Sequence, residues 1–162
     1  MRSSELVDAL RREDLLVSAP RELPILTGVG VDSRAVRPGM LFVAVRGSLA
    51  DGHRFVADAV RRGAAAVVVE QPQTTGVPEV VVRDGRRAAV ALGATWYEHP
   101  ARHLTLLGVT GTNGKTTTTG LLKHLFNDRG AAGSIGTLGA LDRKSTRLNS
   151  SHLKLSRMPS SA

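Results

Sequence analysis

The sequence predicts an α/β protein in which a small mixed α/β domain is followed by the first strand, loop and helix of a phosphate-binding domain. Short, continuous apolar segments of the kind found in buried strands alternate with segments that have the spacing of amphipathic helices. Farther along the chain, a glycine-rich turn stands between an apolar segment and a helical one. The length of 162 residues suffices for one compact domain and part of a second.

The first elements are predicted from the spacing of apolar residues. Leu6, Ala9 and Leu10 lie on one face of a helix predicted over residues 3–13, which we expect to pack as a lid. Two apolar segments then suit strands, and they are residues 25–31 and 40–45.

The alternation of helix and strand continues to the end of the first predicted domain. A short helix is indicated by residues with i, i+3, i+4 spacing, namely Val56, Ala59 and Val60. Gly63 can end this helix. The next predicted elements are strands over residues 64–69 and 80–82 and a helix over residues 84–97. Because Pro100 disfavours helix at His99, we expect the first domain to cover residues 1–99.

Residues 100–141 are predicted to begin a second domain. Residues 104–110 suit a buried strand, the turn after them is rich in glycine, and a helix is expected over residues 115–127. The apolar face of this helix is formed by Leu121, Leu122 and Leu125. One strand, loop and helix cannot bury both faces of a sheet, so the missing partners are expected beyond the native sequence or in another chain.

The tail, residues 142–162, differs from the rest of the chain. It contains six Ser but neither Gly nor Val, and it has no helical or strand period. Residues 142–152 resemble a translated sequencing adapter, so we interpret the tail as foreign to the natural protein and disordered. The tail also carries half of the net charge of +8.

The strongest chemical signal is a phosphate-binding pattern in residues 108–117. Its glycines allow a tight turn whose N–H groups face a polyphosphate, and the following helix directs its positive end to the same place. Lys115 supplies a positive charge for the outer phosphates, and Thr116 offers a hydroxyl to Mg²⁺. The predicted nucleotide-binding residues are Gly111, Thr112, Asn113, Gly114, Lys115, Thr116 and Thr117.

The loop departs from the usual pattern in one respect. Five residues separate Gly108 from Gly114, where the common phosphate loop has four. The alternative is a glycine turn needed only to pack a strand against a helix, but it does not explain why Lys115 and two threonines follow at once.

With this variant spacing, residues 110–117 resemble the signature loop of the ATP-dependent Mur ligases of peptidoglycan synthesis. Residues 97–100, with the sequence Tyr-Glu-His-Pro, also fit that family. Further segments resemble the members that extend UDP-N-acetylmuramoyl-L-alanyl-D-glutamate to a tripeptide, and they are residues 32–34, 38–44, 51–53, 63–64, 69–70 and 136–139. The resemblance covers residues 25–141.

The resemblance implies that the amino-terminal domain holds the UDP part of the muramoyl substrate. The substrate-binding residues carried over by position are Val31, Ser33, Ser48, Leu49 and Ala50. Leu49 is expected to contribute only backbone groups or apolar contact. Two interpretations of Arg34 stay open, a contact with the diphosphate and a salt bridge that holds the turn. His53 is interpreted as a hydrogen-bonding residue of its loop rather than a catalyst.

The reaction implied by the resemblance is ATP-dependent amide formation through an acyl phosphate. Lys115, as the catalytic residue, and Mg²⁺ at Thr116 would neutralise charge on the transferred phosphoryl group. The implied partners are UDP-N-acetylmuramoyl-dipeptide and a diamino acid, with meso-diaminopimelate expected because the Arg-rich, Lys-poor body indicates a GC-rich coding sequence. The family's remaining metal ligands and third domain have no counterpart in 162 residues, so we expect no ligase turnover by this chain. We also expect the chain to be monomeric.

Composition narrows the other classes of function. The absence of cysteine excludes disulfides and thiolate chemistry, and the lack of a long apolar segment predicts a cytoplasmic protein that does not contact membranes. Basic residues outside the tail are dispersed among acidic ones without interleaved aromatic residues, so no nucleic-acid partner is predicted. The alternatives kept open are a non-catalytic UDP-sugar binding module, the D-alanyl-D-alanine-adding Mur ligase and a basic nucleic-acid binder.

Overall fold

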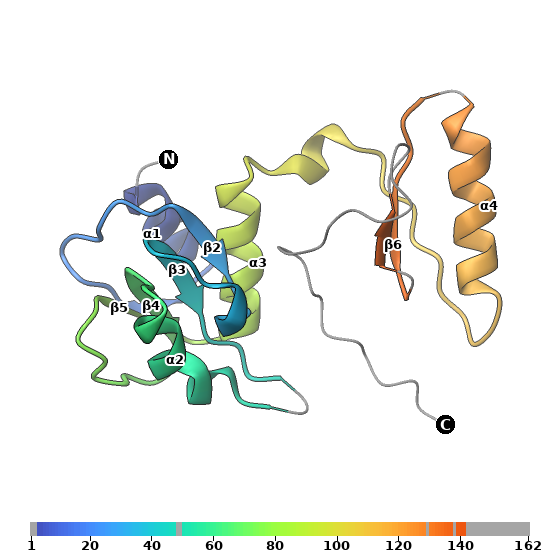
Figure 1. The fold of residues 1–162 in the computed structure, drawn as a ribbon. Coiled ribbons are helices and arrows are strands. Elements are labelled where there is room, and N and C mark those ends of the chain that lie inside the picture. The colour runs from blue at the N-terminus through green and yellow to red at the C-terminus, as the bar shows by residue number, and fades with distance from the viewer. Residues whose placement is uncertain (1–2, 48–49, 129, 138, 142–162) are drawn as a thin grey trace. The chain divides into compact units, whose positions relative to one another are not determined.

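The computed structural model describes residues 3–47, 50–128, 130–137 and 139–141. The chain forms two compact units, Met1–Leu104 and Thr105–Ala162 (Figure 1). No helix in the described ranges is long and apolar enough to cross a membrane. The assignments of residues 1–99, 100–141 and 142–162 to functional domains remain predictions, and the tail lies outside the described residues.

The first unit is built on a five-stranded sheet with the strand order β1-β5-β4-β3-β2. Its strands are β1 (Leu16–Ser18), β2 (Gly28–Gly30), β3 (Met40–Val43), β4 (Ala66–Val69) and β5 (Glu79–Val82). Strands β2 to β5 are parallel, and only β1 runs antiparallel, beside β5. The register pairs Val29 with Leu41, Phe42 with Val67, and Val68 with Val80.

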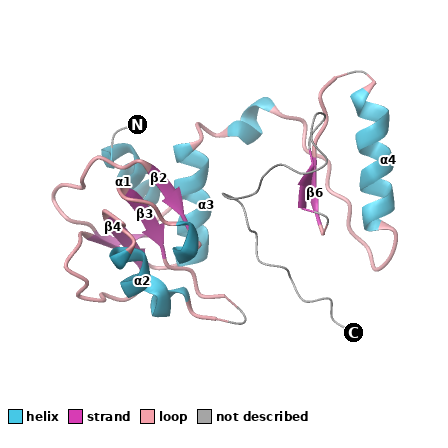
Figure 2. Ribbon diagram, viewed as in Figure 1, coloured by secondary structure: helices cyan, strands magenta, loops and turns pink. Residues whose placement is uncertain are grey.

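Helices cover both faces of this sheet, as Figures 1 and 2 show. Side chains of α1 (Ser3–Arg12) and α3 (Gly85–Trp96) form one core with alternate residues of the strands, including Leu41, Val43 and Val68. On the other face, α2 (Val56–Arg61) packs on Phe42 and Val67. The strands are continuously apolar because both of their faces are buried, which confirms the predicted α/β class.

Three sequence-based expectations for the first unit need correction. The first helix is no lid, because Leu6 and Leu10 are each only 1% exposed and belong to the core. The strand predicted over residues 25–31 is limited to β2, and Ile25 is 90% exposed. Strand β1 was not predicted, since its three residues form a strand through pairing with the edge of β5 rather than through a pattern of their own.

Short 3₁₀ turns connect the larger elements. They are η1 (Ser33–Ala35), η2 (Gly52–Phe55) and η3 (Pro100–His103). Asp32 caps η1 by accepting a hydrogen bond from the Arg34 N–H, and Asp51 caps η2 by accepting one from the His53 N–H. Both caps follow parallel strands, so they lie at the carboxyl edge of the sheet.

The second unit contains α4 (Lys115–Asn127) and an antiparallel pair, β6 (Ser134–Gly136) and β7 (Gly139–Leu141). The predicted helix over residues 115–127 is confirmed. The predicted buried strand over residues 104–110 is wrong, because this segment has no strand assignment and Leu106 is 70% exposed. A strand needs a pairing partner, and the two strands described in this unit pair with each other.

Candidate functional site

The phosphate-loop candidate begins with two glycines in conformations that other residues rarely adopt. Gly111 has a φ of +140°, and Gly114, directly before α4, has a φ of +76°. No side-chain or backbone atom lies within 4 Å of a Cβ built on Gly114, so backbone conformation rather than crowding favours glycine there. The loop thus turns tightly into the helix, as the sequence predicts.

Lys115 is the first residue of α4 and folds back over this loop. Its Nζ donates hydrogen bonds to the carbonyl oxygen of Gly111 and, at 3.2 Å, to that of Thr112. The Thr118 N–H donates to the Gly114 carbonyl at 2.9 Å, which closes the first helical turn. The first N–H groups of a helix have no partner within the helix. These donors and the Lys115 ammonium group therefore lie together at the exposed N-terminus of α4.

Thr116 brings a second segment to the loop. Its Oγ1 lies 3.3 Å from Oγ1 of Thr137, which stands in the turn between β6 and β7. Sequence reasoning did not assign a role to Thr137, although it lies in the segment 136–139 that contributes to the family resemblance. Within the described residues, no group of three or more His, Cys, Asp or Glu side chains could hold a metal ion.

The predicted substrate residues that the structure describes lie at the carboxyl edge of the first unit's sheet. Val31 follows β2 and is 52% exposed, whereas Ser33 is buried at the start of η1. Ala50 follows β3, and its carbonyl accepts a hydrogen bond from the Gly47 N–H at 2.9 Å. Ser48 and Leu49 lie outside the described residues. Ligands of open α/β sheets bind at this edge, which suits the predicted pocket.

Of the two interpretations of Arg34, the structure shows the salt bridge, which is formed with Asp32. Its Nε and Nη2 each lie 2.9 Å from an oxygen of the Asp32 carboxylate. The hydrogen bond to Asp32, with the charge of that group, raises the pKa of Arg34 above its ordinary value. The bidentate pair holds the turn after β2.

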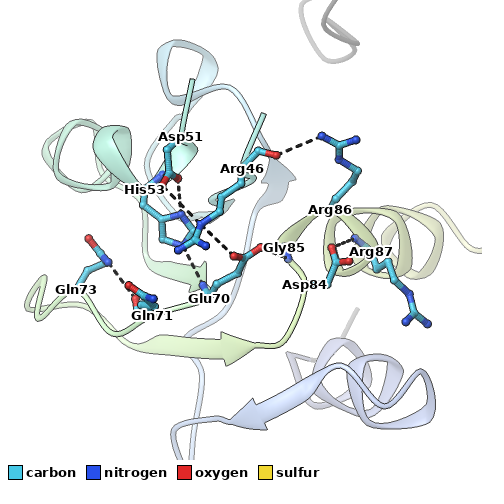
Figure 3. A network of polar contacts seen from close by, with 10 residues as sticks. All are labelled: Arg46, Asp51, His53, Glu70, Gln71, Gln73, Asp84, Gly85, Arg86 and Arg87. Carbon is cyan, nitrogen blue, oxygen red and sulfur yellow. Dashed lines mark hydrogen bonds and ion pairs between the residues drawn. The ribbon is translucent and has the colours of Figure 1, made fainter. Parts of the chain in front are cut away.

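A polar network around Asp51, His53 and Glu70 lies at the same edge (Figure 3). The buried His53 ring places Nδ1 at 2.7 Å from Asp51 Oδ1, while its Nε2 accepts the Glu70 N–H at 2.9 Å. Because Nε2 is an acceptor, the proton is assigned to Nδ1. Hydrogen bonds from the backbone and then the ring of His53 lower the pKa of Asp51. The prediction that His53 is a hydrogen-bonding residue is confirmed.

Comparison with protein families identifies both units. Residues 25–108 match the model described as "Mur ligase family, catalytic domain", and residues 109–161 match the model of the "Mur ligase middle domain". The first match covers more than half of the chain. The chain belongs to the Mur ligase family.

Several relatives of this Mur ligase chain share a name. The UDP-N-acetylmuramoyl-L-alanyl-D-glutamate--2,6-diaminopimelate ligase of Geobacillus thermodenitrificans is 48% identical over 117 residues, covering 72% of this chain and 24% of the relative. The ligase of the same name from Chlorobaculum tepidum is 50% identical over 117 residues, covering 70% and 23%. This Mur ligase chain therefore spans about a quarter of the length of the curated relatives it matches.

A solved structure also resembles the Mur ligase chain. MurF from Acinetobacter baumannii superimposes with a TM-score of 0.60 and 31% sequence identity, covering 78% of this chain and 27% of that one. This similarity to a solved structure also confirms the α/β fold class.

Proposed function

We propose that this chain supplies the substrate-binding unit and the ATP loop of a Mur ligase that adds a diamino acid, meso-diaminopimelate, to UDP-N-acetylmuramoyl-L-alanyl-D-glutamate. The observation that carries the proposal is the glycine loop before α4, with Lys115 folded over it, in a chain 48% identical to a relative named as such a ligase. We place this function in peptidoglycan synthesis in the cytoplasm, with a monomeric enzyme.

In the proposed reaction, the glutamyl carboxylate of the substrate attacks the γ-phosphorus of ATP, which releases ADP and forms an acyl phosphate. The amine of the diamino acid then attacks the acyl carbon, loses a proton and displaces inorganic phosphate, so that an amide forms. Lys115 Nζ would leave the loop carbonyls and contact the outer phosphates, where its charge offsets the charge of the transferred group. The loop N–H groups and the N-terminus of α4 would hold the remaining phosphate oxygens.

The residues present fit Mg²⁺ as a partner of bound ATP. The Thr116 hydroxyl is exposed at the N-terminus of α4, and Mg²⁺ is commonly held by few protein ligands together with phosphate oxygens and water. When bound, Mg²⁺ would offset negative charge on the phosphates. Thr116 is the residue we propose as its ligand from this chain.

The UDP part of the substrate is proposed to bind at the carboxyl edge of the sheet. Val31, Ser33 and Ala50 are the described residues assigned to it, and Ser48 and Leu49 are assigned from the sequence alone. Binding of the uracil base does not require positively charged side chains, because exposed apolar and backbone groups can contact a base. Val31 offers such apolar contact.

Two other functions are kept as alternatives. The similarity to MurF favours the D-alanyl-D-alanine-adding branch, but that identity is 31%, below the 48% and 50% identity to the diaminopimelate-named ligases. The other alternative is a non-catalytic UDP-sugar binding module, which predicts binding of the UDP-muramoyl substrate without ADP formation.

The test is an assay of ADP formation with ATP and two substrate sets. The first is UDP-N-acetylmuramoyl-L-alanyl-D-glutamate with meso-diaminopimelate or L-lysine, and the second is UDP-N-acetylmuramoylalanyl-D-glutamyl-2,6-diaminopimelate with D-alanyl-D-alanine. We expect no turnover by the 162-residue chain. We expect meso-diaminopimelate-dependent turnover by the protein encoded by the natural reading frame, read through codon 141 and beyond. Turnover that depends on D-alanyl-D-alanine would instead identify the D-alanyl-D-alanine-adding ligase. A natural reading frame that ends in the tail would favour the non-catalytic binding module.

A further inference from the structure

The polar network at the carboxyl edge of the first unit has no role in the reaction proposed above. We propose that Arg46 and Glu70 are positioning residues that hold the backbone of Ala50 and Asp51 in place for the UDP part of the substrate. This inference rests on the proposed function, because it assigns to the network the task of ordering the nucleotide pocket. Figure 3 shows the side chains concerned.

Glu70 connects three parts of the first unit. Its Oε1 accepts the N–H of Gly85, the first residue of α3, at 2.8 Å, and its Oε2 lies 3.1 Å from Arg46 Nε. Its own N–H donates to His53 Nε2 at 2.9 Å. The end of β4 is thereby joined to α3 and to the segment that follows β3. Its side chain is only 17% exposed, so solvent screens these contacts less than it would at an open surface.

Two described stretches after β3 are paired: residues 44–47 form a first arm and residues 50–52 form a second arm that contains Ala50. The Gly47 N–H donates to the Ala50 carbonyl at 2.9 Å, the Gly52 N–H donates to the Val45 carbonyl at 3.0 Å, and Arg46 forms a β-bridge with Asp51. A Cβ on Gly52 would lie 2.6 Å from the Val45 backbone, so close approach of the two arms requires glycine. The two arms are thus paired with each other through backbone hydrogen bonds.

Arg46 fixes these paired arms to the sheet. Its Nε lies 3.6 Å from Asp51 Oδ2 and 3.1 Å from Glu70 Oε2, so one guanidinium bridges the second arm and the end of β4. The Arg46 carbonyl accepts a hydrogen bond from Arg86 Nη2 at 3.2 Å, which ties the first arm to α3. Asp51, held by both Arg46 and His53, stands directly after Ala50.

A binding segment that is already held in place loses less conformational freedom when ligand binds, and this raises affinity. The network anchors the segment on both sides, through α3 and through β4. Loss of the Arg46 bridge should therefore weaken UDP binding without unfolding the sheet, whose cores involve neither Arg46 nor Glu70.

The test compares Arg46→Gln and Glu70→Gln with the wild-type chain and with Asp58→Asn. The glutamine at position 70 keeps an acceptor for Gly85 but loses the ion pair with Arg46. Asp58→Asn is the matched control, because it removes the ion pairs with Arg61 and Arg62 at the end of α2, which are not part of the network. Amide exchange at Gly47 and Gly52, UDP titration by calorimetry and far-ultraviolet circular dichroism are measured for each chain.

We expect both network variants to keep their secondary structure, to exchange the two amides about tenfold faster, and to bind UDP about tenfold more weakly, while Asp58→Asn changes neither. Unchanged exchange in both variants would overturn the proposal. Faster exchange with unchanged UDP affinity would overturn the positioning role alone. A folded wild-type chain that does not bind UDP would contradict the proposed function itself, and the positioning role with it.

Discussion

At the scale of single residues, two hydrogen bonds hold the charged side chain of Lys115 against the glycine loop. Its ammonium group rests on two backbone carbonyls of the loop, which are neutral partners that a phosphate can replace. The hydrogen bonds of an ammonium group to phosphate are charge-assisted and stronger than those to a carbonyl. In the proposed function, Lys115 would therefore already lie beside the loop when ATP binds.

Lys115→Ala should weaken binding of ATP to the chain by roughly tenfold to a hundredfold, since one charge-assisted contact contributes about 1.5–3 kcal/mol. Titration calorimetry with ATP and Mg²⁺ measures the effect. Lys123→Ala is the matched control, because it removes the same charge from the same helix two turns away. Equal affinities of the Lys115 variant and the control would contradict the assignment.

Glu79 provides a prediction about acid stability. Burial on its own would raise the pKa of Glu79, but hydrogen bonds from the N–H groups of Gln73 and Thr75 and from the Thr75 hydroxyl lower it overall. A lowered pKa in the folded state means that the carboxylate stabilises the fold above its unfolded pKa of about 4.3 and that this contribution disappears as pH falls through the folded value.

Glu79→Gln should consequently reduce the free energy of unfolding by about 1 kcal/mol at pH 7, and the difference from wild type should shrink below about pH 4. Urea unfolding at several pH values measures it. Glu22→Gln serves as the control, since Glu22 is exposed in the segment after β1. A wild-type advantage that stays constant down to pH 2 would contradict the account.

At the scale of elements, the accuracy of the sequence-based predictions depended on where the stabilising contacts lie. Helix α4 and strand β3 carry their own signals, a glycine before a periodic segment and a continuous apolar stretch. Residues 104–110 carry the same apolar signal, but a strand also requires a neighbour. The contact between His53 and Glu70 joins residues 17 positions apart, and only the topology of the sheet brings them together.

The same dependence holds for the candidate site. The loop residues 111–117 are contiguous, so their spacing alone indicates phosphate binding, whereas Thr137 reaches Thr116 through the turn between β6 and β7. The Arg46 and Glu70 pair likewise spans separate elements. The geometry of the contiguous loop was therefore predictable, and contacts between distant segments were not.

Helix α3 offers a matched pair of glycines for testing its packing. A Cβ on Gly85 would lie 2.5 Å from the Ala44 carbonyl oxygen, while nothing lies within 4 Å of a Cβ on Gly93. We expect Gly85→Ala to destabilise the first unit by about 1–3 kcal/mol and Gly93→Ala to stabilise it by about 0.5–1 kcal/mol, because alanine favours helix. Urea unfolding measures both, and a neutral Gly85→Ala would contradict the close approach of α3 to the residue that follows β3.

At the scale of the whole chain, burial is distributed unequally between the two units. The first unit has a core on each face of its sheet. In the second unit, none of the described residues is buried, and apolar side chains such as Leu107, Leu121 and Ile135 are more than half exposed. Exposed apolar area of this kind marks surfaces that other protein segments cover. Most of the hydrophobic stabilisation therefore belongs to the first unit.

Amide hydrogen exchange should reveal this difference directly. We expect slow exchange in β3, β4 and β5 and exchange at least about a hundredfold faster in α4, because helix stability comes mainly from packing of an apolar face. Exchange followed by nuclear magnetic resonance measures each amide. Equal protection of α4 and β4 would show that the second unit has stabilising contacts beyond those described.

We propose that this Mur ligase chain carries the substrate-binding unit of a ligase that acts on UDP-N-acetylmuramoyl-L-alanyl-D-glutamate. Titration calorimetry of that nucleotide-dipeptide into the 162-residue chain tests this proposal most directly. We predict saturable one-to-one binding that UDP competes away. Absence of binding by a chain whose circular dichroism shows a folded first unit would contradict it.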